Sequence, residues 1–198
     1  MLIKVFRSKD AILQIEQDLF EIEPNSLILI SNKNYETINY QDEICGKTNA
    51  IKMLTNYSKQ KNCTIFFACK FNLFEKISYS VLACANGKIL GIADEGQVDR
   101  ENNELKIFKL PQLNAGLIVG KDLFNLKNAN LLNKFGANIF VNFADENISQ
   151  KLMSYVYVNG NIFNKSIVCV NNNSSLLLKK QRFKTDLILE NNFDIELV

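Results

Sequence analysis

The segment AGLIVGKDLFNLKNANLLNKFGANIFVNF, residues 115–143, has the pattern of a complete βαβ unit. The apolar runs Ala115–Val119 and Ile139–Phe143 are typical of strands that are buried on both faces, and the amphipathic segment between them predicts a helix. In α/β proteins, functional groups commonly lie on the loop that follows the first strand of such a unit. Here this loop reads Gly120-Lys121-Asp122, so it is the first candidate for a functional site.

The rest of the chain alternates strand-like and helix-like patterns, as in an α/β fold with a mixed sheet system. The pair Asn86-Gly87 is a strong hairpin signal between two strand-like runs. The polar residues 31–47 show no period and are expected to form a loop. Further strands are expected at Leu2–Phe6, Leu27–Ile30, Thr64–Cys69, Ser78–Ala85, Lys88–Ala93, Leu105–Leu110, Ser166–Val170, Leu176–Leu178 and Leu187–Leu189.

Helices outside the βαβ unit are expected after three polar residues that can act as N-caps, namely Asp10, Thr48 and Asp145. The first helix should stop at Pro24, the second near Lys59 and the third at about Phe163. The expected buried stripes are Ile12, Ile15, Leu19 and Ile22 in the first helix, Ile51, Leu54 and Tyr57 in the second, Phe124, Leu131 and Phe135 in the helix of the βαβ unit, and Ile148, Leu152, Tyr155/Val156, Asn159 and Ile162/Phe163 in the last.

The composition is that of an ordinary globular protein, with 198 residues, 47% hydrophobic and 22% charged residues. This length suits one domain with a sizeable core. The net charge of +2, without a basic stripe interleaved with aromatic residues, argues against a nucleic-acid partner. The apolar runs are far too short for a membrane span, and the N-terminal MLIKVFRSKD does not resemble a secretory signal. We therefore expect no membrane partner and a cytoplasmic protein.

The chain contains five cysteines without a CxxC pair and contains no histidine. A disulfide framework and a structural zinc site are therefore not expected, and Ser-His-Asp and Cys-His mechanisms are excluded. No metal and no cofactor are expected. The thiols in apolar runs are interpreted as small hydrophobic side chains of the core.

Five segments, in this order, resemble a known family. They are the helix Asp10–Ile22 followed by SLILI, the hairpin ISYSVLACANGKILG, the segment LNAGLIVGKDLFN, the strand NKFGANIFVNF, and the helix Ile148–Phe163 followed by SIVCVNN. Together they resemble the carbon–nitrogen hydrolase (nitrilase and amidase) superfamily. The resemblance implies a four-layer αββα sandwich with mixed sheets, in a single domain over residues 1–198 that is shortened at its C-terminus. It also implies a homodimer and a small amide-like ligand.

The catalysis that the resemblance implies uses a Cys nucleophile, a Glu general base and a Lys that stabilises the tetrahedral intermediate. In this sequence Gly120 stands at the nucleophile position, and it has no side chain that could attack. Asn32 stands at the base position and cannot accept a proton. Glu95 stands at the lysine position and has the wrong charge for an oxyanion. A small shift of the alignment offers Glu36 as base or Lys121 as cation, but it supplies no cysteine near Gly120.

These substitutions predict a carbon–nitrogen hydrolase homologue that has lost its catalysis and acts as a binding or oligomeric protein. Two alternatives stay open, namely an active amide or nitrile hydrolase with a rearranged site and a structural subunit of a larger assembly. A simpler interpretation also stays open for the loop itself. In that interpretation Gly120 is an ordinary turn glycine, and Lys121-Asp122 is a turn residue followed by a helix cap.

Overall fold

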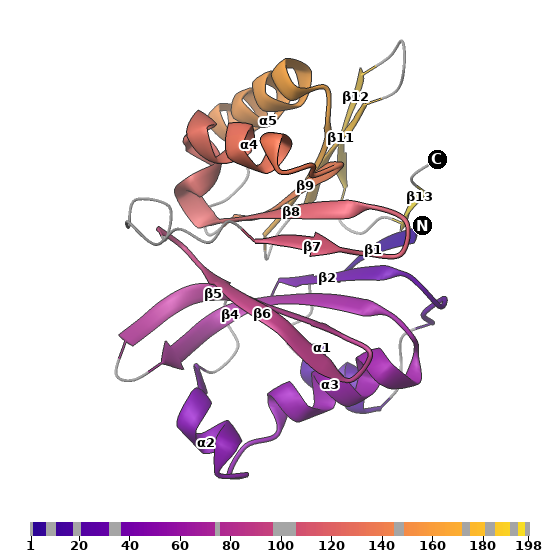
Figure 1. Ribbon diagram of the computed structural model, residues 1–198, viewed down its shortest axis with the longest axis vertical. Helices are drawn as coiled ribbons and strands as arrows, with labels where there is room; N and C mark the ends of the chain where they lie inside the picture. The colour runs from indigo at the N-terminus through magenta and orange to yellow at the C-terminus, as the bar shows by residue number, and fades with distance from the viewer. Residues whose placement is uncertain are drawn as a thin grey trace. The chain divides into compact units, whose positions relative to one another are not determined.

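The computed structural model describes residues 2–6, 11–17, 21–31, 37–73, 76–96, 106–144, 149–171, 175–180, 185–190 and 194–196. The chain divides into two compact units (Figure 1). One unit contains Met1–Ile92 together with Phe193–Val198, and the other contains Ala93–Asn192. Each unit has its own mixed sheet and its own buried cluster of apolar side chains. The single domain expected from the sequence stays a prediction.

The sheet of the first unit has the strand order β13-β1-β2-β4-β5-β6, and β3 pairs with β4. Strands β1, β2 and β4 are parallel, whereas β5 and β13 are antiparallel to their neighbours β4 and β1. The strands are β1 (Leu2–Phe6), β2 (Leu27–Ser31), β3 (Ile38–Asn39), β4 (Thr64–Leu73), β5 (Lys76–Ala85), β6 (Lys88–Asp94) and β13 (Asp194–Glu196). All five residues of β2 are buried, as its continuous apolar sequence predicts.

Three helices belong to the first unit, namely α1 (Ala11–Glu16), α2 (Tyr40–Ile44) and α3 (Ala50–Gln60). The apolar stripe of α3 packs on the sheet, where Leu54 joins Ile28 and Ile65 in one cluster. Ile12 and Ile15 of α1 belong to the same cluster. Burial of these apolar stripes is the main source of helix stability here, because isolated helices of this length are marginal in water.

The sheet of the second unit has the order β12-β11-β10-β9-β8-β7, with β8, β9 and β10 parallel and the outer pairs antiparallel. Its helices α4 (Leu126–Lys134) and α5 (Gln150–Phe163) lie on one side of the sheet (Figure 1). The strands are β7 (Ile107–Lys109), β8 (Asn114–Val119), β9 (Ile139–Phe143), β10 (Ser166–Val170), β11 (Ser175–Lys180) and β12 (Thr185–Glu190). The βαβ unit expected within residues 115–143 is thus β8, α4 and β9, with the short 3₁₀ helix η2 (Gly120–Phe124) inserted after β8.

The hairpin signal is confirmed, because β5 and β6 are joined by Asn86 and Gly87 with φ angles of 51° and 78°. Positive φ at both central residues is the requirement of a type I′ turn, which Asn-Gly satisfies with little strain. The expected strands are all present. Several differ in length from the prediction, and β4 continues to Leu73 while β7 is limited to Ile107–Lys109.

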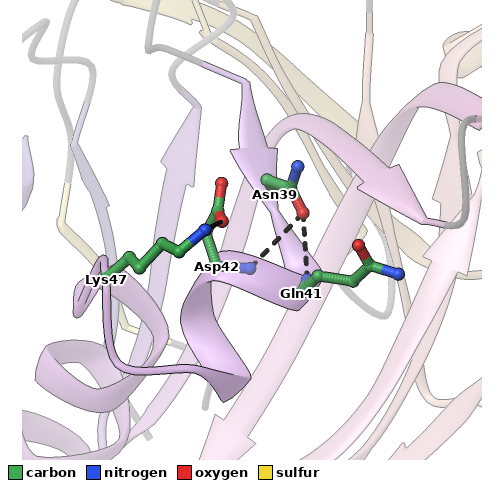
Figure 2. Close-up of polar contacts among 4 residues, drawn as sticks. All are labelled: Asn39, Gln41, Asp42 and Lys47. Carbon is green, nitrogen blue, oxygen red and sulfur yellow. Dashed lines mark hydrogen bonds and ion pairs between the residues drawn. The ribbon is translucent and has the colours of Figure 1, made fainter.

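Residues 31–47 are not the uniform loop that was expected. They include the end of β2, the two-residue strand β3 and the helix α2, which Figure 2 shows with its polar contacts. The Oδ1 atom of Asn39 accepts hydrogen bonds from the backbone N–H groups of Gln41 and Asp42, at 2.9 and 3.4 Å. Lys47 follows the helix and pairs with Asp42 at 3.1 Å. Asn39 is therefore the N-cap that the sequence analysis missed.

Two expected helix boundaries are wrong. Thr48 is exposed and does not cap α3. The side chain of Glu43 accepts hydrogen bonds from the N–H groups of Ala50 and Ile51 instead, both at 3.0 Å. The first helix ends at Glu16, well before Pro24, so Ile22 packs on the core from outside a helix. Asp10 and Asp145, the other two expected caps, lie outside the described residues, and the N-cap of α5 is Ser149.

The expected stripe of the helix in the βαβ unit is confirmed only at Phe124, which packs partly buried against the core from η2. α4 buries Asn128, Ala129 and Leu132, whereas Phe135 is 68% exposed. The cause is the break at Asn125, where η2 ends and α4 begins with a new helical phase. In the last helix α5, Leu152, Val156 and Asn159 are buried as expected, but Ile162 is 60% exposed.

Candidate functional site

The turn after β8 is built around Gly120, which is buried and has a φ of +57°. Because this left-handed conformation strains residues that carry a Cβ, glycine is the residue that suits it best. Val119 is still extended, with φ −115° and ψ 132°, so the chain turns sharply from strand into η2 at Gly120. The backbone N–H of Lys121 and the side chain of Asp122 are the next polar groups of this turn.

Glu95 lies directly against Gly120. It follows β6, and its Oε1 atom accepts a hydrogen bond from the backbone N–H of Lys121 at 2.9 Å. A Cβ atom placed on Gly120 would overlap the Glu95 carboxylate and lie 2.8 Å from its Cγ. The contact is reciprocal, because the Oδ2 atom of Asp122 accepts the N–H of Gly96 at 3.2 Å. Two acidic side chains thus join the segment after β6 to the segment after β8.

Three buried asparagine side chains hold the backbone of this turn. Asn142 of β9 donates through Nδ2 to the carbonyl oxygens of Ile118 and Gly120, at 3.2 and 3.3 Å. Asn128 of α4 donates to the carbonyl of Asp122 at 2.9 Å. The third, Asn159 of α5, donates to the carbonyl of Leu123 at 3.4 Å. Each of the three side chains is at most 1% exposed. Because a buried amide is costly when it is unpaired, these bonds fix the path of the turn.

Cys169 of β10 is connected to the turn through Asn142. Its Sγ lies 3.1 Å from Asn142 Oδ1, to which the thiol donates. The residue is fully buried, and burial raises the pKa of its thiol to about 12. Cys169 is therefore a protonated hydrogen-bond donor at neutral pH, because desolvation disfavours the thiolate that a nucleophile requires.

Three further cysteines are buried in the first unit, and all five cysteines of the chain are free thiols. Burial raises the pKa of Cys63 and Cys84 to about 12, and it raises the pKa of Cys69 still further. Cys45 is exposed, at the C-cap of α2. None of the buried thiols has the electropositive, accessible surroundings of a reactive cysteine.

Of the predicted site residues, the structure brings together Glu95 and Gly120, and it places Lys121 beside them. The side chain of Lys121 is exposed, and its backbone N–H is the group that Glu95 binds. Asn32 and Glu36 lie outside the described residues. Within the described parts of the chain, no cluster of three or more His, Cys, Asp or Glu side chains is arranged to hold a metal ion.

Sequence reasoning missed the roles of Asn128, Asn142 and Asn159. A signal for Asn142 was present, because it is the one polar residue in the run Ile139–Phe143, all of which is buried. A polar residue inside such a run must find a hydrogen-bond partner nearby. The other two asparagines lie on helices, where the sequence does not show which backbone carbonyl an amide will reach.

Comparison with solved structures shows which fold this chain shares. An amidase of the nitrilase superfamily from Nesterenkonia sp. AN1 matches with a TM-score of 0.65 and 10% identity, covering 98% of this chain and 90% of that chain. The chain has the fold of the nitrilase superfamily. The same amidase in complex with butyramide matches with the same scores and coverage. A variant that carries an acrylamide adduct at its active-site cysteine has a TM-score of 0.66 at 9% identity, covering 100% of this chain and 93% of that chain.

No protein-family model and no curated protein matches the sequence. The nitrilase-type α/β fold expected from the sequence is nevertheless confirmed, because each unit supplies a mixed sheet and the helices that cover it. In the described residues, no helix has the length and apolar character needed to cross a membrane. The assignment of Asn32, Glu95 and Gly120 to the three catalytic positions stays a prediction.

Proposed function

We propose that this chain is a non-catalytic protein with the nitrilase fold, which works by binding a partner or a small amide-like ligand. The observation that carries the proposal is the turn after β8, where Gly120 offers no nucleophile and the carboxylate of Glu95 lies against it. A thiol attack needs a thiolate at this position, and the tetrahedral intermediate needs a positive or hydrogen-bond-donating environment. Glu95 brings a negative charge and already uses the N–H of Lys121.

A rearranged active site is the alternative interpretation. It would need a substitute nucleophile, and Cys169 is the thiol that the hydrogen-bond network connects to the turn. Because burial holds this thiol in its protonated form, Cys169 is a poor nucleophile at neutral pH. The proposed substitutes Glu36 and Lys121 supply a base and a cation but no attacking atom. A structural subunit of a larger assembly is compatible with the same features.

The binding role that we propose includes pairing with a second copy of the chain. Three large apolar side chains of α5 are exposed, namely Tyr157 (50%), Val158 (44%) and Ile162 (60%). At 100° per residue they fall on one side of the helix, away from the buried residues Leu152 and Val156. Contiguous exposed apolar surface is typical of interaction sites, and two-fold dimers are the commonest assemblies.

We also propose a cytoplasmic location, which five free thiols support.

Hydrolysis assays test the loss of catalysis. The purified chain is incubated with acetamide, butyramide and a simple aliphatic nitrile, and released ammonia is measured over a long incubation. We expect no release above that of the heat-denatured protein. Ammonia release that a thiol alkylator abolishes would show that the proposal is wrong. The variant Cys45→Ala is the control, because it removes the exposed thiol and should leave the result unchanged.

Covalent trapping provides an independent test of the same point. Fluoroacetamide is added to the native chain, and the mass of the intact protein is measured. An active-site cysteine would gain an acetamide group quickly, whereas buried protonated thiols react slowly. We expect no rapid adduct in the Cys45→Ala protein. A single rapid adduct that maps to one of the four buried cysteines would favour the rearranged site instead.

A further inference from the structure

Glu95 makes two contacts at Gly120 that exclude other groups. Its carboxylate fills the volume that the first atom of a side chain at this position would take. The same carboxylate accepts the N–H of Lys121 at 2.9 Å. Hydrogen bonds to an ionised acceptor are stronger than those between neutral groups. A neutral oxygen of a ligand would therefore be a weaker acceptor for the N–H of Lys121 than the carboxylate of Glu95 is.

We propose that Glu95 is an intramolecular plug that closes the Gly120 turn to acyl ligands in the resting protein. An amide or carboxyl group that approached the turn would need the volume and the N–H donor that Glu95 already occupies. The inference rests on the proposed function, since it treats this turn as the place where a ligand's acyl group would bind. It adds that the turn is blocked from within the same chain.

The plug is held from both sides. Asp122 follows Gly120, and its Oδ2 atom binds the N–H of Gly96, the residue after Glu95. The segment that carries the plug is thereby tied to the turn that it closes. The turn itself is fixed by the buried amides of Asn142 and Asn128, which bind the carbonyls of Gly120 and Asp122. Because Glu95 is only partly buried, its side chain is the part of this contact that can move.

Gly136 provides a matched control in the same unit. Its φ is +87°, so an added side chain would bring backbone strain as at Gly120, but nothing lies within 4 Å of a Cβ placed on it. A substitution at Gly136 therefore measures the cost of left-handed backbone alone. Any additional cost at Gly120 measures the overlap with Glu95.

Thermal unfolding of the unchanged protein and five variants tests the plug. The variants are Gly120→Ala, Gly136→Ala, Glu95→Ala, and the two double variants that combine Glu95→Ala with one of the glycine substitutions. We expect Gly120→Ala to lower Tm more than Gly136→Ala does. In the Glu95→Ala background, the two glycine substitutions should lower Tm by the same amount, because the overlapping carboxylate is gone. If Gly120→Ala lowered Tm by the same amount with and without Glu95, the proposal would be overturned.

Thiol labelling tests the same contact through the reactivity of a thiol at position 120. In a Cys45→Ala background, a maleimide is applied to Gly120→Cys and Gly136→Cys, each with and without Glu95→Ala. Removal of the neighbouring carboxylate lowers the thiol pKa by about one unit and so speeds labelling about tenfold at position 120. The rate at position 136 should not change. An unchanged rate at position 120 would also overturn the plug.

The two proposals can fail separately. If neither Tm nor labelling responds to Glu95, the plug is wrong, yet the chain still lacks a nucleophile at Gly120. If the unchanged protein hydrolyses amides with a thiol-dependent mechanism, the non-catalytic function is wrong, whatever the labelling shows. Ammonia release and labelling rates are therefore measured on the same preparations.

Discussion

Gly120 begins a turn whose backbone is held without any side chain at that position. The turn after β8 has a left-handed residue at its start and carbonyl groups bound by buried amides from β9, α4 and α5. None of these bonds depends on a side chain at position 120. The same scaffold would therefore accept a residue with a side chain only if Glu95 moved and the backbone strain were offset.

Asn142 holds this turn at two carbonyl groups, those of Ile118 and Gly120. The variant Asn142→Leu has a similar volume but leaves the Gly120 carbonyl and the Cys169 thiol without their buried partner. We expect a loss of about 1–3 kcal/mol in the free energy of unfolding. Urea denaturation measures the loss. Asn161→Leu is the control, because this asparagine is exposed on α5, and its effect should stay within about 0.5 kcal/mol. Equal effects of the two variants would contradict the role of Asn142.

At the scale of elements, the helices show how caps arise from residues that are distant in sequence. Glu43 lies at the end of α2, and its two carboxylate oxygens bind the first two N–H groups of α3. A carboxylate at this position satisfies donors that a helix cannot pair internally, and it also interacts favourably with the positive end of the helix dipole. α2 therefore serves as the support that brings this cap into place.

Substitutions at Glu43 and Thr48 test which of these two side chains caps α3. Glu43→Ala should lower the free energy of unfolding by about 1–2 kcal/mol, because both N–H groups lose their acceptor. Thr48→Ala should change it by less than about 0.5 kcal/mol, since Thr48 is exposed and does not cap the helix. Urea denaturation of both variants decides between them. A larger loss for Thr48→Ala would restore the cap expected from the sequence.

The elements that the sequence predicted well are those with strong local patterns. Continuous apolar runs such as Leu27–Ile30 are typical of buried strands, and Asn86-Gly87 is a strong signal for a tight hairpin turn. The stretch 31–47 was missed because β3 has two residues and α2 has five, too few for a period. The stripe of α4 was missed because a change of helical phase at Asn125 leaves no mark in the spacing of apolar residues.

The candidate site was predictable to the extent that it depends on residue types. The residue types, a glycine at position 120 and a carboxylate at position 95, could both be read from the sequence. Their contact could not, because it depends on the conformation of a glutamate side chain after β6 and on where the turn after β8 directs its N–H groups. The buried amides were missed for the same reason.

At the scale of the whole molecule, four buried thiols are distributed over both units. They should make the free energy of unfolding fall as the pH becomes alkaline. Burial raises the folded-state pKa of each thiol, to about 12 for Cys63, Cys84 and Cys169. In the unfolded chain these thiols ionise near their ordinary pKa of about 8.5. The folded state then holds more protons than the unfolded state, so stability is complete below that pH and falls as pH rises toward the folded pKa.

Each buried thiol should cost about 1.4 kcal/mol of unfolding free energy per pH unit within this window. The variant Cys169→Ala removes one such thiol, so its stability should fall less steeply between about pH 9 and pH 11. Urea midpoints across this range, with Cys45→Ala as the exposed control, measure the difference in slope. Identical slopes for Cys169→Ala and the unchanged protein would contradict the prediction.

The assembly of the whole molecule is also open to test. If the exposed side of α5 pairs two copies, light scattering coupled to size exclusion should give the mass of a dimer. The double variant Val158→Lys and Ile162→Lys should then give the mass of a monomer, because two charges would have to be buried without partners. Far-UV circular dichroism checks that the variant remains folded. A monomeric mass for the unchanged protein would rule out this pairing.

Strand β13 closes the first unit with residues from near the end of the chain. Leu2 lies opposite Glu196 in an antiparallel pair, so β1 has an outer neighbour that comes after the whole second unit in the sequence. The whole second unit is inserted between β6 and β13. During synthesis, residues 93–192 can therefore fold while β1 still lacks its outer neighbour. A free edge of this kind is a site of wrong pairing in newly made chains. The pairing of β13 is thus the step that protects β1.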